Sequence, residues 1–290
     1  MTNKFRLKSS AFEREKEEEK EEPAKVFFLS VEGNDTEKEY FRKVSEYRRE
    51  LGINALVDVK VLERAKNDTK SAPQYVIELL EEYIQLRGSS AEQLIDRAYP
   101  LFSEKYTKEQ IADYLGKQKN LTLKEVRRIE SDLMILGCDL NYQQYLSKYN
   151  SEYDEFCIII DRDKETHSEE NMKDCIAHCK KNHYLCYITN PCFEFWLLLH
   201  LCDVKEEFKG QIEKIKANAK VSGRHSFVSN EISQRGHHNK SHIKFEENYL
   251  YTIDQAIERA NDFETKLEKL IDNVGTNIGE LFERLRKQVE

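Results

Sequence analysis

The sequence predicts an α/β fold, in which a parallel four-stranded sheet is flanked by helices. Short apolar runs rich in β-branched and aromatic residues alternate with segments whose apolar residues recur at helical spacing. This alternation is typical of parallel sheets that are covered on both faces. Charged residues make up 34% of the 290 residues, whereas Gly and Pro number only 10 and 4, which favours a helix-rich chain. The predicted strands cover residues 26–31, 56–62, 157–160 and 185–188.

Helices are predicted between these strands and in two further regions. The predicted sheet-bearing core comprises residues 26–87 and 154–203, with helices over about 37–51, 73–86 and 169–181. The interval 88–153 is too long for a connection inside a compact domain and predicts an all-helical insertion, with helices near 90–101, 107–118 and 122–136. Residues 204–290 predict a helical C-terminal region, with helices over about 206–219, 246–260 and 278–289 and a polar loop at 222–241. Residues 1–25 are rich in Lys and Glu and predict a disordered, charged tail.

Composition limits the class of protein. The formal net charge is -8, so a nucleic-acid partner would need a local basic surface. The sequence holds no apolar run of about 20 residues and opens with no signal peptide, so we expect a cytoplasmic protein without a membrane span. Seven cysteines, an odd number in mostly apolar stretches, indicate reduced, buried thiols. Cys175, Cys179 and Cys186 invite a zinc interpretation, but the first two lie on a helix and the third in a strand, so we favour buried thiols here too.

Carboxylates follow two of the predicted strands. Glu32 comes directly after the first strand, and Asp161 and Asp163 end the third. The carboxyl ends of parallel strands meet at one edge of the sheet, where ligands bind in α/β folds. Carboxylates gathered there repel one another unless a cation lies between them, and oxygen ligands suit Mg²⁺ or Mn²⁺. The sequence therefore predicts a divalent-metal site, which can polarise a phosphodiester and activate a water molecule. A strand followed by an acidic turn is the alternative.

Three further residues are candidates near this edge. Glu194 lies in the first turn of a helix that follows the fourth strand. It is a candidate metal ligand, or a residue that positions a ligand or a water molecule. The alternative is a glutamate that is favoured there only by the helix dipole. Glu37 can reach the metal or cap its own helix. Asn190 ends the fourth strand and is a candidate for supporting the ligands or contacting the substrate.

Cations cluster in the polar loop at 222–241. Its candidate phosphate contacts are Arg224, Arg235, His238 and Lys240. A solvated surface loop is the alternative interpretation.

Three segments resemble the RloB-like family, bacterial anti-phage proteins related to abortive-infection systems. They are residues 31–41, which begin Val-Glu-Gly-Asn-Asp-Thr-Glu; residues 160–163, Ile-Asp-Arg-Asp; and residues 189–200, which contain Asn-Pro-Cys-Phe-Glu followed by Trp-Leu-Leu-Leu-His. The resemblance covers roughly residues 26–260 and implies a TOPRIM-like core. It also implies a nuclease that acts on DNA or tRNA, with Glu32 as acid/base or metal ligand and Asp161 and Asp163 as ligands. An ATPase of the ABC or SMC kind is the implied partner, and a homo-oligomer is open.

Two other functions fit parts of the sequence. A non-catalytic TOPRIM-like module could dock an ATPase or sense a phage component, although such a module has no need of three converging acids. A nucleotidyl-transfer enzyme of the primase kind could use the same metal site. The sequence contains no GxxxxGK loop for a nucleoside triphosphate.

Overall fold

The computed structural model describes most of the chain. The described residues are 25–33, 35–62, 72–87, 90–115, 120–135, 153–223, 225–236 and 243–287. The predicted disordered tail at 1–25 lies outside them, except for Lys25.

A mostly parallel sheet organises the fold, as predicted, but it has five strands and not four. The strands are β1 (Lys25–Val31), β2 (Val57–Val61), β3 (Glu155–Asp161), β4 (Leu185–Asn190) and β5 (Gly275–Thr276). Their order is β2-β1-β3-β4-β5, with β5 antiparallel to β4 and the other pairs parallel. The prediction missed β5 because two residues are too few to show a strand period. All four predicted strands are present.

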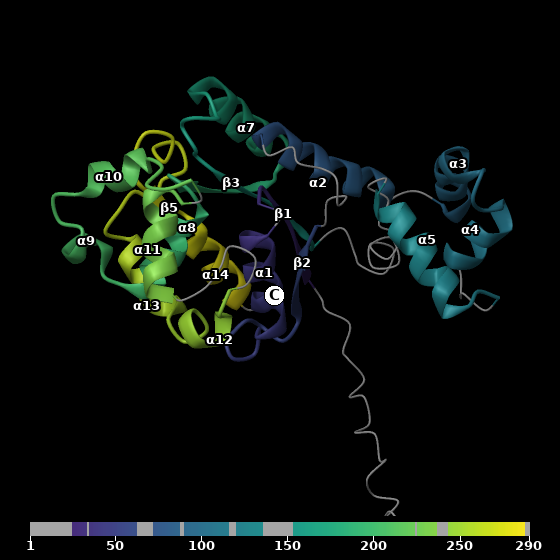
Figure 1. Ribbon diagram of the computed structural model, residues 1–290, viewed down its shortest axis with the longest axis horizontal. Coiled ribbons are helices and arrows are strands. Elements are labelled where there is room, and N and C mark those ends of the chain that lie inside the picture. The colour runs from purple at the N-terminus through teal and green to yellow at the C-terminus, as the bar shows by residue number, and fades with distance from the viewer. Residues whose placement is uncertain are drawn as a thin grey trace, which may run out of the picture.

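Helices cover both faces of this sheet (Figure 1). They are α1 (Thr36–Glu46), α2 (Pro73–Arg87), α3 (Ala91–Phe102), α4 (Lys108–Leu115), α5 (Leu123–Ile135), α7 (Glu169–Asn182), α8 (Phe193–Leu201), α9 (Val204–Glu207), α10 (Ile212–Ala217), α11 (Phe227–Gly236), α12 (Phe245–Asn248), α13 (Ile253–Ala260) and α14 (Ile278–Arg286). Alternate strand residues serve the two faces: Cys157 and Ile159 pack with α1 and α8, whereas Ile158 and Ile160 pack with α2 and α7.

Several predicted helices are shorter or divided. The helix predicted over 37–51 ends at Glu46, and that predicted over 206–219 is interrupted at Gly210, whose φ of +77° no helical residue adopts. The helix predicted over 246–260 is likewise split into α12 and α13. The polar loop predicted at 222–241 is wrong for residues 227–236, which form α11 and bury Val228 and Ile232.

The helices predicted between residues 88 and 153 are present as α3, α4 and α5. Figure 1 shows them gathered at one end of the molecule, beyond the far end of α2 and away from the sheet. Within the described residues, no helix is both long and apolar enough to pass through a bilayer.

A buried hydrogen-bond chain joins α1, α8 and the turn before α13. The indole N–H of Trp196 donates to the Tyr40 hydroxyl at 3.0 Å, and this hydroxyl lies 3.2 Å from His200 Nε2. The other ring nitrogen of His200 lies 2.9 Å from the Thr252 hydroxyl. Burial lowers the pKa of His200 to about 3, so its ring is neutral. His200 is therefore part of the core.

Replacing His200 tests this neutral ring. Below about pH 6.5 the His200 ring is protonated in the unfolded chain but stays neutral in the folded chain. The free energy of unfolding therefore falls as the pH falls toward 3. We expect the free energy of unfolding of the native protein to drop relative to that of His200→Gln, by about 1.4 kcal/mol per pH unit between about pH 6 and 4. Urea unfolding across this range measures it. A constant difference between the two proteins would contradict a neutral buried ring.

Residues at the two ends of α14 hold β4 and the turn before β2. Asn277, just before α14, bonds the backbone of β4 with its side chain, as the backbone of a neighbouring strand would. Its side-chain oxygen accepts the Ile188 N–H at 2.7 Å, and its side-chain NH₂ group donates to the Cys186 carbonyl at 3.0 Å. At the other end of α14, Arg286 donates to the Leu51 carbonyl at 2.9 Å. The segment after residue 275 therefore holds both β4 and the turn that leads to β2.

Candidate metal centre

The predicted carboxylates gather at the carboxyl ends of β1 and β3. Glu32 extends the β1–β3 ladder by donating its N–H to the Ile159 carbonyl at 3.0 Å. Its carboxylate accepts the Asp161 N–H, also at 3.0 Å. This contact fixes the Glu32 side chain across the end of β3. The parallel pairing predicted from sequence therefore brings Glu32 and Asp161 together.

Asp161 is the centre of the cluster. It points to the face of the sheet that α1 and α8 cover, because residues 157, 159 and 161 alternate onto that face. Burial raises its pKa well above the ordinary value, and the nearby carboxylates of Glu37, Glu32 and Glu194 raise it further. A hydrogen bond from the Phe193 N–H, at the start of α8, acts in the opposite direction. Four carboxylates from β1, α1, β3 and α8 therefore share one site.

Glu37 belongs to this cluster and not to a capping arrangement alone. It is buried in the first turn of α1, and its carboxylate lies against the backbone of Gly33. A Cβ at residue 33 would come within 1.8 Å of Glu37 Oε2, so only glycine leaves room for the carboxylate. The Glu32-Gly33 pair thus supplies one carboxylate and the space for another.

His167 is a site residue that the sequence did not reveal. It is buried, and its Nδ1 lies 3.1 Å from the Asp161 carbonyl. Its Nε2 lies 3.3 Å from Glu32 Oε1, without the alignment of a hydrogen bond to any described group. Arg162 holds this loop by donating to the His167 carbonyl at 2.7 Å. The ring therefore lies beside one carboxylate oxygen of Glu32, while the Asp161 N–H donates to the other. A histidine six residues beyond a strand carries no spacing signal, so nothing in the sequence marked it.

Two predicted residues make other contacts. Asp163 lies beyond the end of β3, where its carboxylate accepts the Glu165 N–H at 3.2 Å. Asn190 is fully buried and donates to the Leu270 carbonyl at 2.7 Å, so it holds the loop before β5; its side-chain oxygen has no partner among the described groups.

The predicted phosphate-binding loop is only partly described. Arg235 lies on α11 and forms ion pairs with Glu207 of α9 at 2.6 Å and with Glu231 of its own helix at 3.4 Å. These ion pairs link α11 to α9 at the surface. Arg224, His238 and Lys240 lie outside the described residues.

The carboxylate set fits a hard divalent cation. Four acids in one partly buried site raise the pKa of Asp161, and a positive charge among them would remove that repulsion. In the described part of the chain, no three of their oxygens lie within 4.8 Å of one another. Mg²⁺ commonly keeps several waters and is held by one or two carboxylates, so this wider spacing suits it.

The cysteines behave differently from expectation in one respect. Cys175, Cys179 and Cys186 are buried, as predicted, but their sulfur atoms all lie within 4.8 Å of one another. The placement of two of them on a helix and the third in a strand did not reveal this proximity. A turn of two residues joins α7 to β4, and Cys186 is on the β4 face that packs against α7.

Comparison with known proteins identifies the family. Neither the curated proteins nor the solved structures gave a match to the chain. The family model described as RloB-like protein matches residues 27–285, which include all five strands, apart from the first two residues of β1, and the whole carboxylate cluster. The chain therefore belongs to the RloB-like protein family.

Proposed function

We propose that the chain is a metal-dependent nuclease of a bacterial anti-phage system, built on a TOPRIM-like core. The observation that carries the proposal is the convergence of Glu32, Glu37 and Glu194 on Asp161, at the edge of the sheet where α/β folds bind ligands. Like charges destabilise one another, so a fold that gathers them needs a compensating role for them. Binding a cation for phosphodiester chemistry is such a role.

The residues divide into ligands and positioning groups. Asp161 and Glu194 are the proposed ligands of Mg²⁺ or Mn²⁺, with Asp163 and Glu37 able to complete the set through water. When bound, the cation would polarise the phosphodiester and lower the pKa of a bound water. Glu32 is fixed by the Asp161 N–H, which suits either a ligand or a general acid/base. His167 then acts on Glu32 and is a positioning residue.

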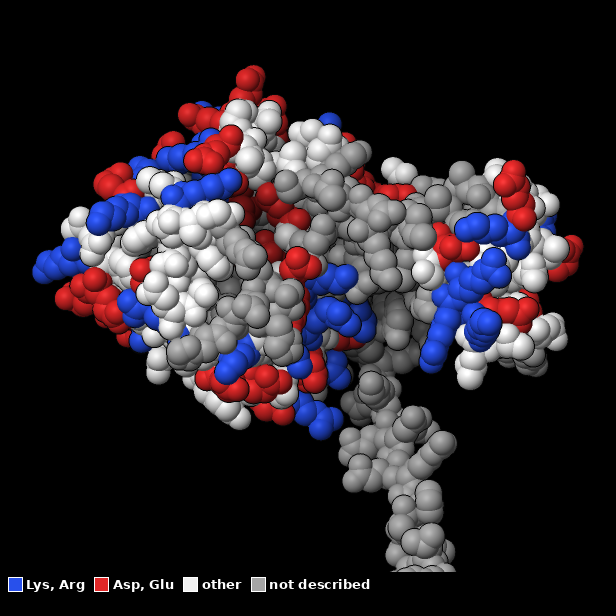
Figure 2. All heavy atoms as spheres, viewed as in Figure 1, with Lys and Arg blue, Asp and Glu red and all other residues white. Residues whose placement is uncertain are grey.

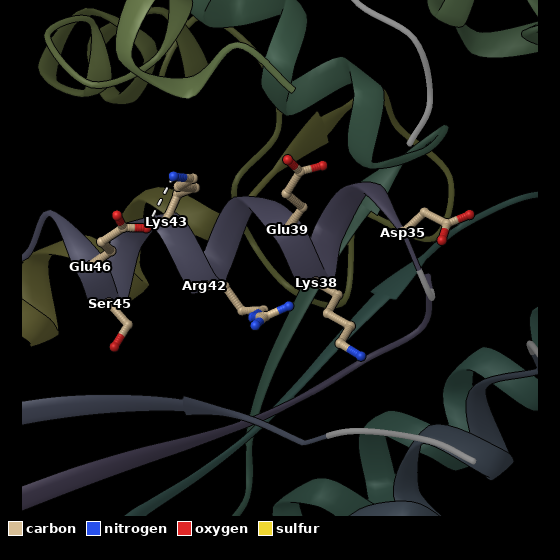
Figure 3. A pocket seen from close by; sticks show the side chains of 7 residues that line it. All are labelled: Asp35, Lys38, Glu39, Arg42, Lys43, Ser45 and Glu46. Atoms are coloured by element: carbon tan, nitrogen blue, oxygen red, sulfur yellow. Dashed lines mark ion pairs between the residues drawn. The ribbon is translucent and has the colours of Figure 1, made fainter. Parts of the chain in front are cut away.

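A basic side of α1 lies next to this cluster. Figure 3 shows Lys38 and Arg42 projecting to one side of the helix, whereas Glu39, Lys43 and Glu46 project to the other. Lys38 follows Glu37 directly, and Arg42 is about one turn further along. In Figure 2, Lys and Arg gather in the area where α1 and β2 lie in Figure 1, beside a hollow lined by Asp and Glu. We propose that Lys38 and Arg42 contact the phosphates of the nucleic acid.

The wider setting is proposed from the family. The RloB-like resemblance favours DNA or tRNA as the substrate and an ABC- or SMC-type ATPase as the controlling partner.

A cleavage assay tests the proposal. The purified protein is incubated with plasmid, single-stranded DNA and total tRNA, with Mg²⁺ or Mn²⁺ and separately with EDTA. We expect cleavage of at least one substrate, its loss in EDTA, and a loss of at least about 100-fold in Glu32→Gln. Glu165→Gln is the matched control, because this exposed glutamate lies on the β3–α7 loop and its side chain takes no part in the cluster. Equal activity in EDTA, or in Glu32→Gln, would refute the metal mechanism. Absence of cleavage, also with the ATPase present, would favour the non-catalytic docking module.

Gly33→Ala tests the role of Glu37. The added methyl group would displace the Glu37 carboxylate, which is the end of a flexible side chain, so the fold is expected to persist. We expect cleavage to fall about 10–100-fold with little change in the unfolding midpoint. Gly223→Ala is the control, because a Cβ there meets no atom within 4 Å. Full activity of Gly33→Ala would exclude Glu37 from the site.

Arg42→Glu tests the basic side of α1. Arg42 is exposed, so the variant should fold normally. Removing one phosphate contact should weaken binding to all nucleic-acid sequences alike and reduce the slope of log affinity against log salt by about 1. Binding titrations at several salt concentrations measure this slope. Lys209→Glu, an exposed charge reversal between α9 and α10, should leave it unchanged.

A further inference from the structure

Three cysteines form a compact sulfur cluster on the sheet face opposite the carboxylates. Cys175 and Cys179 lie one turn apart on the side of α7 that faces the sheet, and Cys186 points up from β4. Their exposed fractions are 4%, 0% and 7%, and their sulfur atoms lie within 4.8 Å of one another. In the described residues, this is the one group of three or more metal-binding side chains with such spacing.

The spacing suits a thiophilic cation. A metal–sulfur bond of about 2.3 Å places the sulfurs of three ligands roughly 4 Å apart, so small side-chain movements would close the site. Thiolates select soft ions such as Cu⁺ and Zn²⁺ over Mg²⁺.

An acidic pocket gives access to the cluster. Cys175 lines a surface pocket of about 380 Å³ together with Glu78, Glu81, Asp174 and His178. His178 Nε2 lies 2.6 Å from Glu81 Oε1, which pairs a histidine with an orienting carboxylate beside the sulfurs. The carboxylates would attract a cation, and Cys175 would be the first sulfur that it meets.

We propose that Cys175, Cys179 and Cys186 bind one thiophilic cation, Cu⁺ or Zn²⁺, which ties α7 to β4. Three sulfurs alone complete the shell of Cu⁺, whereas tetrahedral Zn²⁺ needs a fourth donor. The candidate is His178, which lines the same pocket as Cys175 and lies outside the 4.8 Å group that the three sulfurs form. Each thiol that binds gives up its proton to the buffer, so binding strengthens as the pH rises. The site is separate from the carboxylate cluster and does not depend on nuclease activity.

Metal competition tests the proposal on the full-length, reduced protein. Zn²⁺ and Cu⁺ are offered separately from chromophoric chelators, and the stoichiometry, the affinity and the unfolding midpoint are measured. We expect one equivalent of at least one of the two ions, a raised midpoint, and protection of three thiols from alkylation. In Cys175→Ser and Cys179→Ser the affinity should fall at least about 100-fold. His178→Gln should weaken Zn²⁺ binding and leave Cu⁺ binding unchanged.

The control is a cysteine from the opposite side of the sheet. Cys202 is buried, packs with the α1 and α8 face, and donates to the Leu198 carbonyl, a bond that serine can keep. Cys202→Ser should therefore bind the metal like the native protein. Circular dichroism shows whether each variant is folded, and the thiol-protection pattern of the native protein stands even if one variant is not. Binding of neither ion, or equal binding by the cysteine variants, would overturn the proposal.

Discussion

An Asp161→Asn variant is expected to lose at least about 100-fold of the cleavage activity and, in the absence of metal, to be more stable than the native protein. Activity falls because the amide removes the central proposed ligand. Stability rises because Asp161 is a half-buried acid beside Glu32, Glu37 and Glu194, and the amide carries no charge for them to repel. The Phe193 N–H can still donate to the amide oxygen. We therefore expect a higher unfolding midpoint for the variant than for the native protein at neutral pH.

The stability difference between the native protein and Asp161→Asn is expected to depend on pH. The pKa of Asp161 is raised in the folded state, so the folded protein holds a proton that the unfolded chain releases above about pH 4. The native protein therefore loses stability as the pH rises through that raised pKa, and Asp161→Asn does not. The difference between the two should vanish below about pH 4 and grow above it. Urea unfolding at several pH values measures this difference.

Added Mg²⁺ should reverse the order of stability. A cation that binds only the folded native protein stabilises it, and the variant lacks the central ligand. Asp163→Asn is the control for the metal-free comparison alone, because its amide oxygen can still accept the Glu165 N–H and its charge is not among those that act on Asp161. A variant that is inactive but less stable than the native protein, at every pH and without metal, would contradict the electrostatic account of the cluster.

Gly275→Ala is expected to be the most destabilising of the single methyl additions considered. Gly275 lies in β5 between Asn190 of β4 and Glu264, and a Cβ there would come within 1.9 Å of the Glu264 carbonyl oxygen. A backbone carbonyl cannot turn aside as a side chain can, so the strand itself must move. We expect a loss of about 3 kcal/mol, which denaturant unfolding at neutral pH measures.

Gly279→Ala provides a matched comparison. Gly279 is also buried, but it lies in α14, and a Cβ there would meet Ile257 at 3.5 Å, an ordinary contact. Alanine also favours the helix, so this variant should equal or exceed the native protein in stability, by up to about 1 kcal/mol. Equal effects of the two substitutions would show that the close approach at Gly275 is not decisive.

Much of the fold could be predicted because buried parallel strands have a strong local signal. The run at 157–160 is apolar at every position and the run at 26–31 at every position except Ser30, which few other elements require. Helix ends were predicted less well, since Gly210 interrupts a segment whose apolar spacing is otherwise helical. The strand β5 escaped prediction because its partner β4 defines it, and its own two residues do not.

For the candidate site too, the sequence could place some residues and not others. Glu32 and Asp161 could be placed together because parallel neighbours end at one edge, and this needs only strand order. Glu37 and Glu194 were candidates from their places in the first turns of helices that follow strands, but the directions of α1 and α8 decide that both act on Asp161. His167 depends on how the β3–α7 loop folds back, and the sequence offered no period by which to find it. The one-turn spacing of Cys175 and Cys179 was visible, but their meeting with Cys186 follows from the two-residue turn between α7 and β4.

The closure by α14 has a consequence for synthesis on the ribosome. Glu32 and Asp161 are translated well before the groups that hold β4 and the turn before β2, among them Asn277 and Arg286. Domains fold as units while synthesis proceeds at about 5–20 residues per second. A nascent chain would therefore carry the acids for many seconds before their frame is complete. A polypeptide that stops before α14 therefore lacks the groups that hold the sheet edge, and this edge is complete only once Asn277 and Arg286 have been made.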